Sequence, residues 1–332
     1  MNKNNIEQTP RERLMMALKG GMPDGVPWAE MSIAKSLRTA YADRIAPGQT
    51  LEEFLGICNV FCGAICPPGI CRFGRSEDGH QYIIDGLLKT REDLPKIAGA
   101  FPDPESDVLY EEVYQALKRA PKDLATTVVT DLGAGSAIQS MGVEGFSYAL
   151  SDDPEFVGEV FRQFSQWSAK VLRRLCGMGF DFIWSGGDIA WKSAPFFSPE
   201  VFRRQILPSL RIAAKEITLP WVYHSDGNLM PILEDLLSLG MNALHPFEPG
   251  SMDIRAVKRQ YGRRLCVVGN VDIDCLSRGS AEEIRTITRE LIKDLGPQGG
   301  YIISSSNSLA HYVKTENVVA MGQTIRMNPV KA

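Results

Sequence analysis

The feature that most restricts the fold is a pattern repeated from residue 126 onward, in which a short apolar run precedes a longer segment with helical periodicity. Such alternation is typical of parallel strands that are connected by helices. Each run stops abruptly at glycine, proline or polar residues, as buried strands do. The runs, some of them given with the residues that end them, are 126–131, 180–185, 221–223, 243–249, 266–272 and 300–305.

Chain length narrows the choice of fold. A chain of 332 residues, of which 44% are hydrophobic, can bury one large core, and single domains of this size are commonly α/β barrels. Before the repeats, Thr9 and Pro10 predict the start of a helix, and a short strand is expected to end at Glu30. The sequence therefore predicts one (β/α)₈ barrel domain over residues 1–332, with residues 1–24 as an N-terminal tail and helical extension.

Composition excludes several classes of partner. The formal net charge is −4 and no long basic run occurs, which argues against nucleic acid. No apolar stretch is long enough for a membrane span, and the amino terminus lacks the apolar core of a signal peptide. We therefore expect a cytoplasmic protein with no membrane partner.

The seven cysteines are then expected to be thiols rather than disulfides. Four of them are close in sequence, which raises the alternative of a zinc site or cluster. Proline residues interrupt this segment and no Cys-x-x-Cys pair occurs, so the sequence favours core thiols. The four are Cys58, Cys62, Cys66 and Cys71.

Polar residues lie where the predicted strands end, which is the part of a barrel that forms the active site. His224 and Asp226 are two positions apart, so they point the same way and are candidates for metal binding or proton transfer. Alternatively, His224 only ends a strand and Asp226 caps the following helix. The recurrence of polar residues at other strand ends favours a shared site. The candidates are Glu30, Asp188, His224, Asp226, Glu248, Asn270 and Asn307.

Aromatic residues accompany the same strand ends. They suit a flat pocket for an aryl group, or they pack the barrel rim, and the sequence leaves both interpretations open. They are Trp184, Trp191, Phe196, Phe197 and Phe247.

Several segments together resemble the uroporphyrinogen decarboxylase superfamily, and the resemblance extends over nearly the whole chain. The segments are residues 9–14, 187–188 with 198–199, 224–227, 269–272 and 316–317. The superfamily contains decarboxylases of the haem pathway and methyltransferases that work with corrinoid proteins. The decarboxylases carry an arginine-rich amino-terminal segment and a Phe-Ser-Asp motif, and this chain instead has an acid, Glu30, in the amino-terminal region. A polyanionic tetrapyrrole would be repelled there.

Methyltransferases of this superfamily that act on thiols typically hold zinc with His-x-Cys and a distant Cys. Counting back from residues 316–317, this chain has Asp226 and Asn307 at those two cysteine positions. The resemblance therefore implies an altered metal site, for which we expect zinc with His224, Asp226 and Glu248 as ligands. Oxygen ligands leave a harder Lewis acid than thiolates do, and such an acid suits an ether oxygen.

The resemblance thus implies the methyltransferase I component of an O-demethylase, which moves a methyl group from a methoxylated compound to cob(I)alamin. We favour an aryl methyl ether as the donor. The chain has no Asp-x-His-x-x-Gly motif, so the cobalamin is expected on a separate corrinoid protein. Catalysis is assigned to His224, Asp226, Glu248 and Asp188, and substrate binding to Glu30, Trp184, Trp191, Phe247, Asn270 and Asn307.

Two alternatives stay open. In the first, the protein decarboxylates a less anionic substrate and uses His224 and Asp226 for proton transfer. In the second, it is a non-catalytic barrel that binds a corrinoid or tetrapyrrole. Barrels of this superfamily often dimerise, so a homodimer is also compatible with the resemblance.

Overall fold

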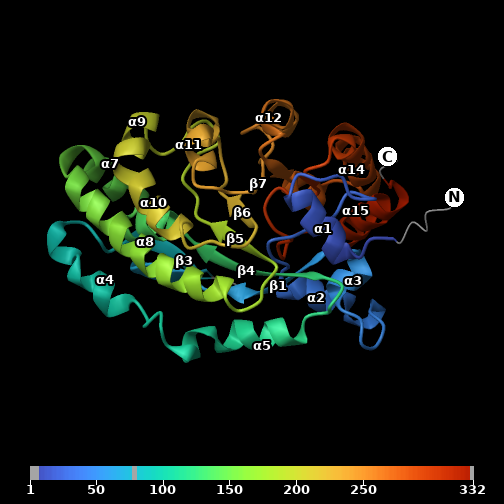
Figure 1. The fold of residues 1–332 in the computed structure, drawn as a ribbon, viewed down its shortest axis with the longest axis horizontal. Coiled ribbons are helices and arrows are strands. Elements are labelled where there is room, and N and C mark those ends of the chain that lie inside the picture. Colours follow the sequence, from blue (N-terminus) through green and yellow to red (C-terminus); the bar gives the residue numbers. More distant parts are fainter. Residues whose placement is uncertain (1–6, 77–80, 330–332) are drawn as a thin grey trace.

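The structure of the protein is a computed structural model that describes residues 7–76 and 81–329 (Figure 1). The expected N-terminal tail lies mostly outside the described residues, since residues 1–6 are among those not described.

A curled, parallel, seven-stranded sheet forms the centre of the described part of the chain. The strands are arranged in their order along the sequence, and every neighbouring pair is parallel. This order is the one found in α/β barrels and agrees with a TIM-like fold. The strands are β1 (Asn59–Ala64), β4 (Ala125–Asp131), β5 (Phe182–Gly186), β6 (Trp221–His224), β7 (Ala243–His245), β8 (Cys266–Val268) and β9 (Tyr301–Ile302).

A short segment around Trp28 connects the two edges of this sheet. On one side, the carbonyl of Trp28 accepts a hydrogen bond of 2.7 Å from the backbone N–H of Cys58, just before β1. On the other side, Trp28 forms a parallel bridge with Ile303, just after β9. The short strand that we predicted to end at Glu30 therefore lies between the first and last strands of the sheet.

Helices surround the sheet in Figure 1. Among the described residues, no helix is both long enough and apolar enough to span a lipid bilayer. The helices are α1 (Pro10–Leu18), α2 (Lys35–Tyr41), α3 (Leu51–Leu55), α4 (Pro95–Ala100), α5 (Glu111–Arg119), α6 (Ala134–Met141), α7 (Val143–Asp152), α8 (Pro154–Cys176), α9 (Pro199–Val201), α10 (Leu207–Ala214), α11 (Leu233–Leu237), α12 (Ile254–Tyr261), α13 (Ile273–Arg278), α14 (Ala281–Leu295) and α15 (Thr315–Met327).

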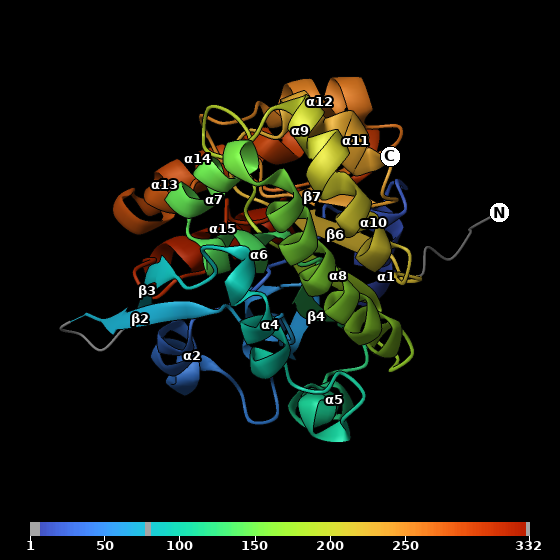
Figure 2. The ribbon, with the colours of Figure 1, turned by 90° about the vertical axis from the view of Figure 1, so that its left-hand side faces the viewer.

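Helix α1 packs against the inner face of the sheet and does not project as an extension. Thr9 and Glu12 form a capping box at its start, as the sequence around Pro10 indicates. Its buried Leu14 and Leu18 pack with residues of the inner face of the sheet. A second feature does project: β2 (Cys71–Arg75) and β3 (Gln81–Gly86) form an antiparallel ribbon outside the main sheet (Figure 2).

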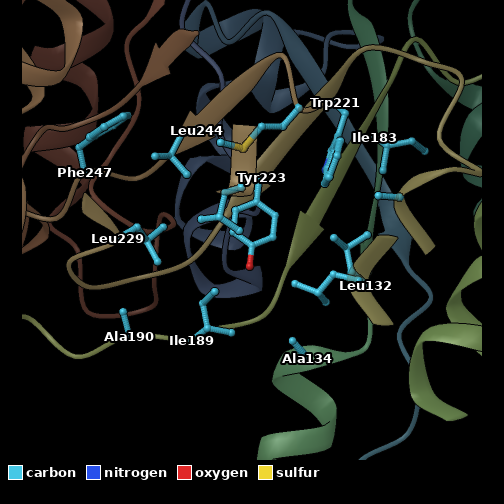
Figure 3. Close-up of a cluster of buried hydrophobic side chains, with 14 of the residues drawn as sticks. Leu132, Ala134, Ile183, Ile189, Ala190, Trp221, Tyr223, Leu229, Leu244 and Phe247 are labelled. Atoms are coloured by element: carbon cyan, nitrogen blue, oxygen red, sulfur yellow. The ribbon is translucent and has the colours of Figure 1, made fainter. Parts of the chain in front are cut away.

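The two faces of the sheet build separate clusters, because side chains alternate along a strand. On β6, Trp221 and Tyr223 pack outward with Ile183 and Leu244 (Figure 3). Val222 belongs to the inner cluster instead. The same alternation carries the next residue of the inner face, His224, into the barrel interior at the carboxyl end of β6.

Candidate metal centre

The turn after β6 positions the central histidine and carboxylate. His224 is the last residue of the strand and is buried, while Asp226 lies in the following turn. Gly227 has a φ of 88°, a conformation that favours glycine. A Cβ at this position would lie 2.5 Å from the carbonyl oxygen of Trp191. The close approach of these two chain segments therefore requires glycine in the His-Ser-Asp-Gly turn.

Asp188, His224 and Asp226 form a cluster in which one potential ligand atom from each residue lies within 4.8 Å of the others. The His224 Nε2 atom is 3.7 Å from Asp188 Oδ1 and 3.9 Å from Asp226 Oδ1. The backbone N–H of Asp226 also donates to Asp188 Oδ1 at 2.9 Å, so the loop after β5 and the turn after β6 are held together. In the described residues, the neighbouring cysteines at positions 58–71 form no such cluster.

One oxygen of Asp226 is left without a hydrogen bond. Asn307 donates from Nδ2 to Asp226 Oδ2 at 2.8 Å, whereas the buried Asp226 Oδ1 has no partner. Burial raises the pKa of Asp226 to about 7, and the nearby charges of Asp188 and Glu248 add to this effect. The hydrogen bond from Asn307 opposes it. A buried, unsatisfied carboxylate oxygen beside two other carboxylates is an environment that a cation would stabilise.

The cluster also has the donor chemistry and approximate spacing of a zinc site. Zinc binds imidazole nitrogen and carboxylate oxygen at about 2.0–2.1 Å, so tetrahedral ligand atoms are about 3.4 Å apart. The separations of 3.7 and 3.9 Å from His224 Nε2 would need only a small contraction. The residues present therefore fit a divalent cation with one nitrogen and two oxygen ligands.

His245 is a functional candidate that our sequence reasoning did not select. It ends β7 and is the register partner of His224 in the neighbouring strand. The two Nδ1 atoms are 2.7 Å apart, and both side chains are buried. Burial lowers the pKa of His224 and lowers that of His245 well below its usual value. The signal in the sequence was that both histidines end adjacent strands at equivalent positions.

Glu30 is buried in the barrel interior and is not a member of the Asp188–His224–Asp226 cluster. It accepts hydrogen bonds from Trp28 Nε1 at 2.7 Å and from the backbone and hydroxyl of Ser305 at 2.9 and 2.7 Å. The hydroxyl of Ser304 lies 3.4 Å from Glu30 Oε2 and 3.4 Å from His245 Nε2. Burial raises the pKa of Glu30 to about 7, against the effect of these hydrogen bonds. Glu30 is therefore connected to the cluster only through other residues.

Two further predicted polar residues support the loop after β7. Glu248 lies 3.2 Å from Lys192 Nζ and accepts from Ser251, so it neighbours the cluster electrostatically without being one of its three members. Asn270 donates from Nδ2 to the carbonyl oxygen of Phe247 at 2.7 Å. Phe247 has a φ of 55°, which is unfavourable for a bulky residue. The bond from Asn270 thus holds a strained loop that carries Glu248.

The predicted aromatic pocket divides into buried and exposed residues. Trp184 and Phe247 are completely buried, which favours packing over contact with a ligand (Figure 3 for Phe247). Trp184 meets His245 edge-on at 5.1 Å between ring centroids. Trp191 is 57% exposed and packs edge-on against Phe196 at 4.7 Å. Phe197 is buried and stacks on Phe202.

The position of Trp191 places it beside the cluster. Its carbonyl oxygen accepts from the backbone N–H of Asn228 at 2.8 Å, in the turn that carries Asp226. A separate hollow of about 580 Å³ lies beside α1, and its lining includes Met15 and Lys19. That hollow has none of the titratable residues of the cluster. The chemistry therefore points to the carboxyl end of β5 and β6, not to this surface hollow.

Comparison with known proteins gives a family and two relatives. The model of the family described as uroporphyrinogen decarboxylase (URO-D) matches residues 83–327. A methylated-thiol–coenzyme M methyltransferase of Methanosarcina mazei is 25% identical over 98% of this chain and 91% of its own length. A uroporphyrinogen decarboxylase of Trichodesmium erythraeum is 24% identical over 71% of this chain and 67% of its own length.

A solved structure supports the fold. A methyltransferase from Methanosarcina mazei superimposes with a TM-score of 0.69 at 19% sequence identity, over 97% of this chain and 99% of that one. The likeness extends over nearly the full length of both chains. It therefore agrees with the TIM-like arrangement that the strand order indicates.

Proposed function

Since this chain belongs to the uroporphyrinogen decarboxylase family, we propose that it is a corrinoid-dependent methyltransferase whose methyl donor is a methoxylated compound. The proposal favours the methyltransferase branch because the methyltransferase relative aligns with 98% of the chain. It departs from a thiol donor because the cluster offers carboxylate oxygen and imidazole nitrogen. We also propose that the chain is a single barrel domain, with the segment around Trp28 as its eighth strand.

The observation that carries the proposal is the unpartnered Oδ1 of Asp226 facing His224 and Asp188. These three residues would hold the cation, for which we propose zinc, and Glu248 would add negative charge nearby. When bound, zinc supplies a Lewis acid that stabilises negative charge developing on a leaving oxygen. Asn307 keeps the other Asp226 oxygen occupied, so it orients Oδ1 toward the cluster.

Without a cation, one of the same residues offers an alternative way to stabilise the leaving oxygen, which is to protonate it. Transfer breaks the bond between the methyl carbon and the ether oxygen, forms a bond between that carbon and cobalt, and leaves a phenolate or alkoxide to be protonated. The electron pair for the new bond would come from the cob(I)alamin of the partner protein. The pKa of Asp226, about 7, makes this carboxyl group a suitable proton donor at neutral pH when the cation is absent.

For the donor, we propose an aryl methyl ether bound beside Trp191. This indole is 57% exposed, and its backbone meets the turn that carries Asp226. An exposed indole braced by Phe196 offers a flat apolar face to an aromatic ring. Trp184 and Phe247 would contribute indirectly, by packing the residues behind the cluster.

For the acceptor, we propose a cobalamin carried by a separate corrinoid protein that docks at the carboxyl end of the strands. Large aromatic side chains are exposed there, namely Trp191 and Tyr312, each 57% exposed. Exposed aromatic residues are frequent at protein interfaces. We place the reaction in the cytoplasm, in keeping with seven free cysteines, and we leave a homodimer as a proposal of the resemblance.

A decarboxylase is the second candidate. The observation in its favour is a pair of acids, the half-buried Asp226 and the buried Glu30, whose pKa values are each raised to about 7 and which suit proton transfer to a carbanion. The relative from Trichodesmium erythraeum, a uroporphyrinogen decarboxylase, shows that this family includes such enzymes. This candidate predicts release of carbon dioxide without any corrinoid.

The test is a methyl-transfer assay with chemically reduced free cobalamin and a panel of methoxybenzoates. Methylcobalamin is detected by its absorption spectrum. Its formation should require both the protein and zinc, and it should not form with the His224→Ala variant. The Lys192→Met variant is the matched control, because it removes an exposed charge beside Glu248 and leaves the three cluster residues intact. Transfer from methyl thioethers alone would contradict the proposed donor, and carbon dioxide release without cobalamin would favour the decarboxylase.

A further inference from the structure

A buried chain of polar side chains runs inward from the cluster, and the methyl-transfer proposal does not use it. His224 contacts His245, His245 lies next to Ser304, and Ser304 lies next to Glu30. All four side chains are buried. His224, His245 and Ser304 each lie two positions after an inward-facing strand residue, and Glu30 reaches Ser304 from the segment around Trp28.

At the Glu30 end of this series of side chains, the direction of each hydrogen bond is fixed. Glu30 is surrounded by donors: the indole N–H of Trp28, the backbone N–H and hydroxyl of Ser305, and the hydroxyl of Ser304. Its two oxygens therefore act as acceptors, which is the hydrogen-bonding pattern of a carboxylate. The Ser304 hydroxyl then gives its only hydrogen to Glu30, and its oxygen is left to accept from His245 Nε2.

These hydrogen-bond directions determine which nitrogen of each imidazole carries the hydrogen. A neutral imidazole carries one N–H, so His245 with a hydrogen on Nε2 has a lone pair on Nδ1. That lone pair faces His224 Nδ1 at 2.7 Å, a distance that requires a hydrogen between the two nitrogens. His224 must supply it from Nδ1, because His245 Nδ1 carries only a lone pair and cannot donate. The remaining nitrogen of His224, Nε2, then presents a lone pair.

From this geometry we infer that Glu30, Ser304 and His245 are positioning residues that fix His224 in the tautomer with Nδ1 protonated and Nε2 free to bind a cation. The inference rests on the proposed cation site but not on the identity of the methyl donor. The opposite tautomer would put a hydrogen on Nε2, and the nearest carboxylate oxygens, at 3.7 and 3.9 Å, are beyond hydrogen-bonding distance. A partner that orients a ligand histidine through its second nitrogen commonly changes metal affinity by about 10- to 100-fold.

The direct test is the tautomer itself, read by long-range ¹H–¹⁵N correlation NMR of protein labelled at histidine. The chain has only four histidines, and single variants assign them. At about pH 8, above the pKa of Glu30, His224 should carry its hydrogen on Nδ1 and His245 on Nε2. A hydrogen on His224 Nε2 in the wild-type protein would overturn the inference.

Variants test the chain link by link. His245→Phe keeps the ring that packs against Trp184 but removes the acceptor, so His224 should lose its single tautomer, and zinc affinity measured by chelator competition should fall about 10- to 100-fold. His245→Asn retains an acceptor near the Nδ1 position and should restore part of the affinity. Equal tautomers and equal affinity in wild type and His245→Phe would refute the role of His245.

Ser304→Ala covers the case in which a ring replacement fails to fold. It should disturb the tautomers of His245 and His224, because the hydroxyl that connects His245 to Glu30 is gone. Ser168→Ala is the matched control, since Ser168 is a buried serine of α8 whose hydroxyl makes no hydrogen bond. If Ser304→Ala leaves the tautomers unchanged, as Ser168→Ala should, the hydrogen-bonded side chains from Glu30 to His245 do not fix the tautomer of His224. The predicted tautomers can be observed even if methoxybenzoates are not methyl donors. A failure of the donor proposal can therefore be distinguished from a failure of this inference.

Discussion

Replacing Asp226 by asparagine is expected to stabilise the metal-free protein at alkaline pH. In the folded protein the pKa of Asp226 is raised from 3.8 to about 7, first by burial and then by Asp188 and Glu248. A carboxyl group with a raised pKa binds its proton more tightly in the folded state than in the unfolded state. Its stabilising contribution is therefore present at low pH and is lost as the pH rises from about 4 through about 7.

The size of the effect follows from the same shift. A difference of about three pKa units changes the free energy of unfolding by about 4 kcal/mol above both pKa values, at about 1.4 kcal/mol per unit. The side chain of Asp226 keeps 31% of its exposure, so solvent screening reduces the expected value to about 2 kcal/mol. Asparagine imitates the neutral acid at every pH. Asp226→Asn should then gain about 2 kcal/mol over the wild type at about pH 8 and nearly nothing at about pH 3, below both pKa values.

The assay is urea unfolding of both proteins at the two pH values with a chelator present, followed by circular dichroism. Added zinc should reverse the order at about pH 8, because a ligand that binds only the folded wild type stabilises it. An Asp226→Asn variant that is less stable than the wild type at the higher pH would refute the reasoning. The same gain at both pH values would also refute it, because titration would then play no part.

Three other substitutions separate the roles of the neighbouring residues. Asn307→Leu removes the donor to Asp226 Oδ2, so the pKa of Asp226 should rise by about one further unit, seen as an upward shift in the pH dependence of zinc affinity. Asn270→Ala removes the hydrogen bond to the carbonyl oxygen of Phe247 and should lower the free energy of unfolding in urea by about 1–2 kcal/mol. A variant as stable as the wild type would contradict this role of Asn270. Trp191→Ala should raise KM for an aryl donor with little change in Tm, whereas Trp184→Ala should cost about 3–5 kcal/mol of stability; the reverse pattern would contradict their assigned places.

Much of the fold follows from local sequence patterns. The predicted segments at residues 221–223 and 243–249 contain most of β6 and all of β7, because a buried parallel strand needs a short apolar run. The aromatic and β-branched residues at 82–84 lie in β3, in keeping with their preference for strands. The capped start of α1 was also readable from Thr9 and Glu12. Its packing into the inner cluster was not, because that contact depends on distant strands.

The candidate site was only partly readable for the same reason. His224, Asp226 and Asp188 adjoin strand ends, so their convergence follows from the topology of parallel strands. Glu248 also follows a strand end, but its carboxylate contacts Lys192 and Ser251 instead of the cluster. No local sequence pattern indicates such partners. His245 was overlooked because a histidine before proline reads as a strand end.

The aromatic residues show a further limit of sequence reasoning. Trp184 and Trp191 follow one another closely in the chain, yet one is completely buried and the other is 57% exposed. Trp184 lies within β5 and points to the inner cluster, whereas Trp191 lies beyond the strand in a loop. Hydrophobic character alone does not distinguish a core indole from one that faces a ligand.

The central claim is that Asp188, His224 and Asp226 bind one divalent cation. The most direct measurement is a crystal structure of protein purified with zinc, with anomalous data collected on both sides of the zinc absorption edge. We predict one strong peak per chain within about 2.2 Å of His224 Nε2 and of a carboxylate oxygen from each aspartate. A peak among the cysteines at positions 58–71, or no peak at the three residues, would contradict the account.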